Sequence, residues 1–134
     1  MTANEAYKLL QNMIEIPSLS REEAAVADFL QNYLENIGLE INRVGNNLFS
    51  ISKDYSESKP TILLNSHIDT VKPSALWTKD PFKATEEDGK LYGLGSNDAG
   101  ASVVSLIATF VSLTAKPQPY NLILGISCQE EVSG

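Results

Sequence analysis

The chain has 134 residues, of which 43% are hydrophobic, so it has the size and the apolar content of a single folded domain. It carries 17 Asp and Glu against 10 Lys and Arg, and the resulting net charge of −7 makes a nucleic acid an unfavourable partner. No basic amphipathic stretch indicates a membrane surface either, so we expect neither nucleic acid nor membrane as a partner.

A single cysteine, Cys128, rules out an internal disulfide and suits a reducing compartment. The N-terminal stretch mixes Glu, Gln and Asn with its apolar residues, so it lacks the continuous apolar core of a signal peptide. We therefore expect a cytoplasmic protein.

Two helices are expected in the N-terminal part of the chain. The first covers about residues 4–13 and ends before Pro17, because the residue before a proline is disfavoured in the helical region. Ser20 and Glu23 have the spacing of a capping box, which predicts the start of the second helix. Gly38 is expected to end it in the left-handed conformation. Its apolar residues follow helical spacing: Val26, Phe29, Leu30, Tyr33, Leu34 and Ile37.

The middle of the chain reads as strands and turns. Residues 39–44 and 47–53 are predicted to be two strands around the turn GNN, and residues 82–93 a hairpin centred on EDG. The continuous apolar run 61–68 is typical of a strand covered on both faces. Residues 69–80 show no periodicity.

Residues 99–115 are apolar, but they include five hydroxyl residues and are short for a membrane span, which favours a buried helix. Residues 120–131 are predicted to form a last strand, apolar until its final residues. Because strands and helices alternate, we expect the α/β class, with a mixed β-sheet flanked by helices.

Polar side chains gather where three of these elements begin or end. The single histidine, His67, ends a strand, and Asp69, two residues on, shares its face if the strand persists that far. Asp98 precedes the apolar helix, and Glu130 and Glu131 end the last strand. Ligands of open α/β sheets bind outside the carboxyl ends of strands, where these groups could converge. Unpaired carboxylates brought together are costly, whereas a divalent cation binds both carboxylates and neutral imidazole. One histidine with several carboxylates suits zinc, manganese or cobalt.

Each of these features also has an ordinary structural explanation. A histidine at a strand end can be solvated or hydrogen-bonded, a glutamate pair can be a solvated turn, and Asp98 can be the N-cap of its helix. The glycines near the hairpin can simply provide backbone freedom: Gly93, Gly95 and Gly100. We interpret one aromatic segment as packing rather than substrate contact: Trp77, Pro81 and Phe82.

The order of four stretches gives the chain a resemblance to a known family. The stretches are NSHIDTV, WTKDPF, DGKLYGLGSNDAG and CQEEVSG, and the helical start LLQNMIEIPSLSREE is also similar. With these motifs the chain resembles the co-catalytic zinc hydrolases that include acetylornithine deacetylase, succinyl-diaminopimelate desuccinylase and aminoacylase. It looks most like acetylornithine deacetylase, and the resemblance covers essentially the whole chain.

The resemblance implies a role for each polar residue. His67 would be a terminal ligand of one metal ion, Asp98 would bridge two ions, and Glu131 would be a terminal ligand of the second. Of the catalytic positions, Asp69 would orient the imidazole of His67, and Glu130 would be the general base that takes a proton from the attacking water. The implied cofactors are two divalent metal ions, with zinc first and cobalt or manganese as alternatives.

The resemblance also implies a cis peptide bond between Asp98 and Ala99. Where the family reads D-x-K-G, this chain reads DAGA, without the lysine. The family's catalytic domain is completed by a later acidic ligand, a late histidine and a smaller inserted dimerisation or lid domain, none of which these residues contain. We therefore interpret residues 1–134 as the N-terminal part of the catalytic domain of a longer enzyme, homodimeric when complete. Alone, it is expected to be inactive and, with an open sheet edge, to aggregate.

The activity that the resemblance implies is metal-dependent hydrolysis of the amide bond of a small N-acylated amino acid. Deacylation of N-acetyl- or N-succinyl-ornithine in arginine biosynthesis is the favoured reaction. A di- or tripeptidase and a succinyl-diaminopimelate desuccinylase are the alternatives within the family. A catalytically inactive binding homologue is the non-enzymatic alternative.

Two other enzyme classes fit the sequence less well. GLGSNDAG has two of the three glycines of a dinucleotide-binding loop, but Asp98 stands at the third position and would face a pyrophosphate. A cysteine hydrolase would pair Cys128 with His67, yet Cys128 follows an apolar strand and is expected to be a small buried residue.

Overall fold

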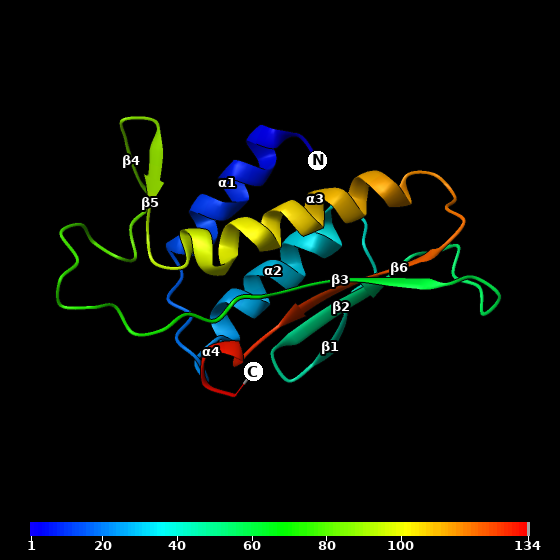
Figure 1. Cartoon of the computed structure of the whole chain (residues 1–134), viewed down its shortest axis with the longest axis horizontal. Coiled ribbons are helices and arrows are strands. Elements are labelled where there is room, and N and C mark those ends of the chain that lie inside the picture. Colours follow the sequence, from blue (N-terminus) through cyan, green and yellow to red (C-terminus); the bar gives the residue numbers. More distant parts are fainter. Residues whose placement is uncertain (134) are drawn as a thin grey trace.

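The computed structural model describes residues 1–133, and within this range it contains a four-stranded mixed sheet with helices packed on one face (Figure 1). The strand order is β1-β2-β6-β3. Strand β2 runs antiparallel to β1 and β6, whereas β3 runs parallel to β6. The predicted α/β class is therefore confirmed. The strands are β1 (Asn42–Val44), β2 (Asn47–Ile51), β3 (Thr61–His67) and β6 (Asn121–Ser127).

Three helices form the second layer: α1 (Ala3–Ile14), α2 (Ala24–Asn36) and α3 (Ser102–Thr114). Helix α3 packs on β3 and β6, and α2 packs on β2. The stretch Ser96–Thr114 is long and apolar enough for a membrane span, but α3 buries one side against the sheet, as predicted for a core helix. The core joins all three helices to the sheet: Leu9, Leu10, Met13, Val26, Leu30, Leu34, Leu48, Val104, Ile107, Phe110, Leu122, Leu124 and Ile126.

The start of α2 differs from the prediction. Arg21 has a φ of 77°, and the helix begins only at Ala24. The capping box of Ser20 and Glu23 is therefore wrong: Glu23 accepts a 2.7 Å hydrogen bond from the backbone N–H of Arg21, and the Ser20 hydroxyl points elsewhere. Gly38, with a φ of 89°, follows the end of the helix as predicted.

Both predicted hairpins are present. The first joins β1 and β2, and the second joins β4 (Thr85–Glu87) to β5 (Lys90–Tyr92) in a separate two-stranded sheet. The strands are shorter than expected, but their turns lie at the predicted positions.

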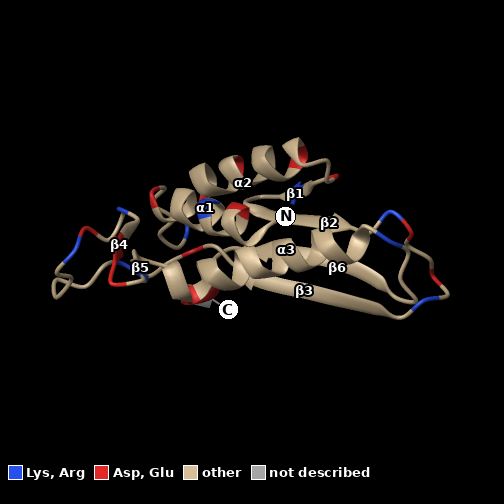
Figure 2. Ribbon diagram, turned by 90° about the horizontal axis from the view of Figure 1, so that it is seen from above, with Lys and Arg blue, Asp and Glu red and all other residues tan. Residues whose placement is uncertain are grey.

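Strand β3 is less buried than its apolar sequence predicts. Leu63 is 60% exposed and Ile62 is 42% exposed, so the expectation of a strand covered on both faces is wrong for the described part of the chain. The reason is that β3 lies at the edge of the sheet and the helices pack on one face. On the other face the register aligns Ile51, Ile123 and Leu63 across β2, β6 and β3. Figure 2 shows that β3 and β6 carry no Lys, Arg, Asp or Glu, so this open face and edge have exposed apolar side chains and none of these charged groups on the two strands.

Candidate active site

The parallel pairing of β3 and β6 brings two of the predicted polar clusters to the same end of the sheet. The register aligns His67 with Ser127, so the chain leaving β6 passes beside His67. Gln129 has a φ of 62° and turns the chain into the short helix α4 (Glu130–Ser133) (Figure 1). Glu130 and Glu131 therefore open a helix, whereas the sequence predicted that they end a strand.

The third cluster comes from a kinked segment, η1 (Ser96–Ala101), that precedes α3. The turn before it is tight: Gly95 has a φ of 72°, and the N–H of Gly100 donates to its carbonyl at 2.8 Å. A Cβ atom on Gly100 would lie 2.7 Å from that oxygen, so glycine is required there. This turn places Asp98 opposite the end of β3.

Asp98 faces His67 rather than the end of its helix. The N-cap residue of α3 is Ala101, which makes no side-chain capping bond, so the interpretation of Asp98 as N-cap is wrong. Oδ1 of Asp98 lies 3.1 Å from Nε2 of His67. The peptide bond between Asp98 and Ala99 is cis, as the family resemblance implies.

The structure brings the three predicted metal ligands together. One ligand atom from each of His67, Asp98 and Glu131 lies within 4.8 Å of the other two. An imidazole nitrogen and two carboxylates are donors that fit a divalent ion such as zinc. His67 is buried, Glu131 is half-buried and Asp98 is exposed, so the cluster opens to solvent on one side.

The second nitrogen of His67 is held by Asp69. Nδ1 lies 3.1 Å from the Asp69 carbonyl oxygen and 3.3 Å from its carboxylate Oδ1. Because β3 ends at His67, this contact comes from the loop after the strand and not from a shared strand face. With Nδ1 engaged, Nε2 is the nitrogen directed at Asp98 and available to a metal ion.

Asp69 also holds the start of α4, a role that the sequence did not reveal. Its fully buried carboxylate accepts hydrogen bonds of 3.1 Å from the backbone N–H groups of both Glu130 and Glu131. It accepts a third, of 2.7 Å, from the hydroxyl of Ser20. One carboxylate therefore links the histidine on β3 to the two glutamates after β6.

The charges in the cluster favour a cation. Burial lowers the pKa of His67, but the Asp69 charge, the hydrogen bond to Asp98 and the Glu130 charge outweigh it, so the pKa lies above its usual value. Burial, together with repulsion from Asp98, raises the pKa of Glu131. Burial also acts to raise the pKa of Asp69, but hydrogen bonds from Ser20 and the two N–H groups lower it overall. The excess negative charge is what a divalent cation would neutralise.

Glu130 lies at the rim of the cluster. Its Oε2 is 3.8 Å from Nε2 of His67, and its side chain is 54% exposed. Its backbone is fixed by Asp69 while its carboxylate remains accessible. An exposed carboxylate beside the cluster can accept a hydrogen bond from a water molecule there.

Cys128 does not have the environment of a nucleophile. Its thiol donates to the backbone carbonyl of Asn46 at 3.3 Å. Burial, followed by the charges of Glu23 and Asp69, raises the pKa of Cys128 to about 12, so the thiol is protonated at neutral pH.

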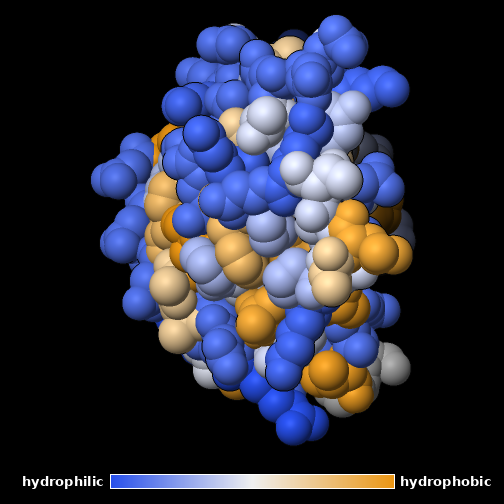
Figure 3. Space-filling model, turned by 90° about the vertical axis from the view of Figure 1, so that its left-hand side faces the viewer, coloured by the Kyte–Doolittle hydropathy of each residue, from blue (hydrophilic) through white to orange (hydrophobic). Residues whose placement is uncertain are grey.

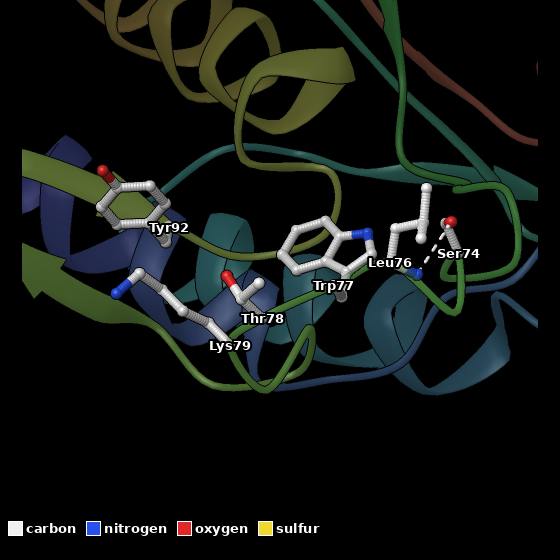
Figure 4. A pocket seen from close by; sticks show the side chains of 6 residues that line it. All are labelled: Ser74, Leu76, Trp77, Thr78, Lys79 and Tyr92. Atoms are coloured by element: carbon white, nitrogen blue, oxygen red, sulfur yellow. Dashed lines mark hydrogen bonds between the residues drawn. The ribbon is translucent and has the colours of Figure 1, made fainter.

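The loop after Asp69 forms a separate pocket of about 330 Å³, and the proposed ligands are not among its lining residues. Trp77 and Tyr92 line it, and Lys79 lies with its Nζ 4.7 Å from the Tyr92 ring centre (Figure 4). Trp77 was predicted to pack rather than to contact substrate, but its side chain is not buried, since the residue is 37% exposed. Figure 3 shows the end of the molecule that carries this loop, where apolar side chains interrupt a mostly hydrophilic surface.

Comparisons with known proteins identify the family of the chain. The profile of the peptidase family M20/M25/M40 matches residues 63–134. The chain is 31% identical to an acetylornithine deacetylase from Buchnera aphidicola subsp. Schizaphis graminum, over 95% of this chain and 37% of that protein. It is 28% identical to a succinyl-diaminopimelate desuccinylase from Wolinella succinogenes, over 87% of this chain and 32% of that protein.

A solved structure shares the fold. The M20 family metallo-carboxypeptidase from Sulfolobus solfataricus superposes with a TM-score of 0.77 at 22% identity, over 98% of this chain and 32% of that chain. The chain thus spans about a third of the length of the curated relatives it matches. Because the family profile covers more than half of the residues, the chain belongs to peptidase family M20/M25/M40, a family of hydrolases.

Proposed function

We propose that this chain forms part of an enzyme that hydrolyses the amide bond of a small N-acylated amino acid in a metal-dependent reaction. The observation that carries the proposal is the convergence of His67, Asp98 and Glu131 beside Glu130. Three elements far apart in the sequence supply these groups. A solvated turn or a surface histidine would not need this arrangement.

His67, Asp98 and Glu131 would hold the metal, with Asp98 between two ions, His67 on one and Glu131 on the other. Zinc is the first choice, with cobalt or manganese as alternatives. When bound, the ions would polarise the amide carbonyl and make water more acidic. Asp69 keeps Nε2 of His67 directed at the ligand cluster through its contacts with Nδ1.

Glu130 would move the proton. As general base it accepts a proton from the attacking water, and as general acid it returns the proton to the nitrogen of the leaving amine. Its backbone is fixed by the bond to Asp69, and its exposed carboxylate lies beside the ligand cluster. The adjacent Glu131 would act as ligand, so neighbouring residues divide the two tasks.

We propose N-acetyl- or N-succinyl-ornithine as the substrate, with a role in arginine biosynthesis. The 31% identity to a protein named acetylornithine deacetylase supports this choice. Desuccinylation of succinyl-diaminopimelate is the alternative, supported by the 28% identity to a desuccinylase, and a di- or tripeptidase is a further one. We also propose that residues 1–134 are the N-terminal part of the catalytic domain of a cytoplasmic homodimer.

A substrate panel tests the proposal. The full-length protein is incubated with zinc and N-acetylornithine, N-succinylornithine, N-succinyl-diaminopimelate or a dipeptide, and amine release is followed for each. The proposal expects the highest kcat/KM for an acylated ornithine. A higher kcat/KM for the diaminopimelate substrate or the dipeptide would establish the corresponding alternative. No release from any of them by a folded, metal-loaded protein would favour the inactive binding homologue.

A further inference from the structure

The hydroxyl of Ser20 occupies a specific place in the network behind the ligand cluster. Its Oγ donates to Oδ2 of Asp69 at 2.7 Å, across 49 residues of sequence. Oδ2 also accepts from the N–H of Glu131, while Oδ1 faces the N–H of Glu130 and Nδ1 of His67. Each oxygen of the buried carboxylate therefore has two partners. Of these four groups, the Ser20 hydroxyl is the one that comes from neither a proposed metal ligand nor the proposed base.

We propose that Ser20 is a positioning residue, which fixes the orientation of the Asp69 carboxylate and, through it, the metal-facing direction of the His67 imidazole. The inference rests on the proposed function, because it assigns Ser20 an effect on metal affinity.

Backbone hydrogen bonds hold the segment around Ser20 in the position from which its hydroxyl contacts Asp69. The N–H of Ser20 donates to the carbonyl of Thr70 at 3.1 Å, and the N–H of Thr70 donates to the carbonyl of Ser18 at 2.9 Å. Leu19 and Thr70 form a parallel bridge between these bonds. These backbone bonds fix residues 18–20 beside Thr70, the residue after Asp69. The position of the Ser20 hydroxyl relative to the Asp69 carboxylate is therefore set by the backbone.

The physical effect of the hydroxyl follows from the burial of Asp69. A carboxylate that is 0% exposed has no water to replace a lost donor, so its orientation depends on the groups that contact it. Without Ser20, Oδ2 keeps only the N–H of Glu131, and the carboxylate can rotate away from the geometry in which Oδ1 meets Nδ1 of His67. The imidazole would then be held at Nδ1 by the Asp69 carbonyl oxygen alone, and would be less well oriented for a metal ion. Loss of a group that orients a ligand directly costs about 10–100-fold in metal affinity, and Ser20 acts one bond further out, so we expect roughly 5–10-fold.

The test compares four forms of the full-length protein: the wild type, Ser20→Ala, Ser20→Thr and Ser18→Ala. Ser20→Thr keeps a hydroxyl at the same position. Ser18→Ala is the matched control, because Ser18 is a buried serine of the same segment that contacts Thr70 through its backbone and makes no hydrogen bond to Asp69. The dissociation constant for zinc is measured by competition with a chromophoric chelator, and the unfolding temperature of each metal-free protein is measured in parallel.

The proposal expects weaker zinc binding for Ser20→Ala, with recovery in Ser20→Thr and wild-type affinity in Ser18→Ala. Zinc affinity of Ser20→Ala within about 2-fold of the wild type would overturn it, as would an equal loss in Ser18→Ala. If Ser20→Ala does not fold, Ser20→Cys, which has a similar size but a weaker donor, replaces it with the same criteria. A wild type that binds zinc but hydrolyses nothing would overturn the proposed function. The zinc affinities of the variants would still decide whether Ser20 is a positioning residue. A wild type that binds none of zinc, cobalt and manganese would overturn both.

Discussion

Nε2 of His67 and Oδ1 of Asp98 lie 3.1 Å apart, although 31 residues separate them in the sequence. The contact joins the end of β3 to the kinked segment before α3. The Asp98 side chain is nevertheless 76% exposed to solvent. Asp98 therefore contributes little to the buried core. Its position fits the proposed role as a metal ligand, together with His67 and Glu131.

This geometry predicts the effect of Asp98→Ala in the full-length protein. Zinc affinity and hydrolysis should be lost, because a central ligand is removed, while the unfolding temperature of the metal-free protein should change little, because the side chain is exposed. The control is Glu40→Gln, which removes an exposed negative charge outside the cluster. A large drop in the metal-free unfolding temperature would show that Asp98 is structural.

Substitutions of the two adjacent glutamates should distinguish the general base from the metal ligand. Glu130→Gln should lower kcat by about 10²- to 10⁴-fold and leave zinc affinity nearly unchanged, because it removes the proton acceptor but no ligand. Glu131→Gln should weaken zinc binding itself. Both variants keep the backbone N–H groups that bond Asp69. Kinetics and zinc competition on the two proteins check this division, and the reverse pattern would exchange the two roles.

The metal-free protein should show a pH dependence that comes from His67. Its pKa in the folded chain is raised above the usual value of 6.5, so protonated His67 adds stability that is fully present below about pH 6.5. That stability is lost as pH rises through the raised pKa. The free energy of unfolding of the wild type should therefore exceed that of His67→Gln by more in mild acid than in mild base, as measured by urea denaturation. A difference that grows with pH would contradict the assigned contacts.

Cys128 should be unreactive and dispensable for chemistry. With a pKa of about 12 the thiol is almost wholly protonated near neutral pH, so iodoacetamide should modify the folded protein far more slowly than the unfolded protein. Cys128→Ala should retain hydrolysis. Loss of hydrolysis in a folded Cys128→Ala protein would revive the cysteine-hydrolase alternative.

The helices, and the element ends at which the polar residues gather, could be predicted from the sequence because their signals are local. Helical spacing around Leu30 and the apolar run around Ile107 identify helices whatever they pack against. His67, Asp98 and Glu131 each stand next to a strand end or a glycine turn, where parallel pairing and a tight bend bring them together.

The predictions from the sequence were wrong where a contact with a residue far along the chain determines the local structure. Ser20 has the spacing of a capping residue, but its hydroxyl bonds to Asp69, 49 residues away. The helix α4 begins at Glu130 because the same carboxylate accepts two of its N–H groups, and a four-residue helix has no periodicity to detect. The exposure of Leu63 on β3 depends on which elements cover the sheet, which its own apolar sequence does not state.

The most direct test of metal-dependent hydrolysis is to follow bound metal and amine release in one sample of the full-length protein. Metal is removed with a chelator and then titrated back as zinc, with the best substrate of the panel present. Release should stop as the metal is lost and return in proportion to the zinc rebound, reaching its maximum at two ions per chain. Amine release that continues at full rate after the metal has gone would contradict metal dependence.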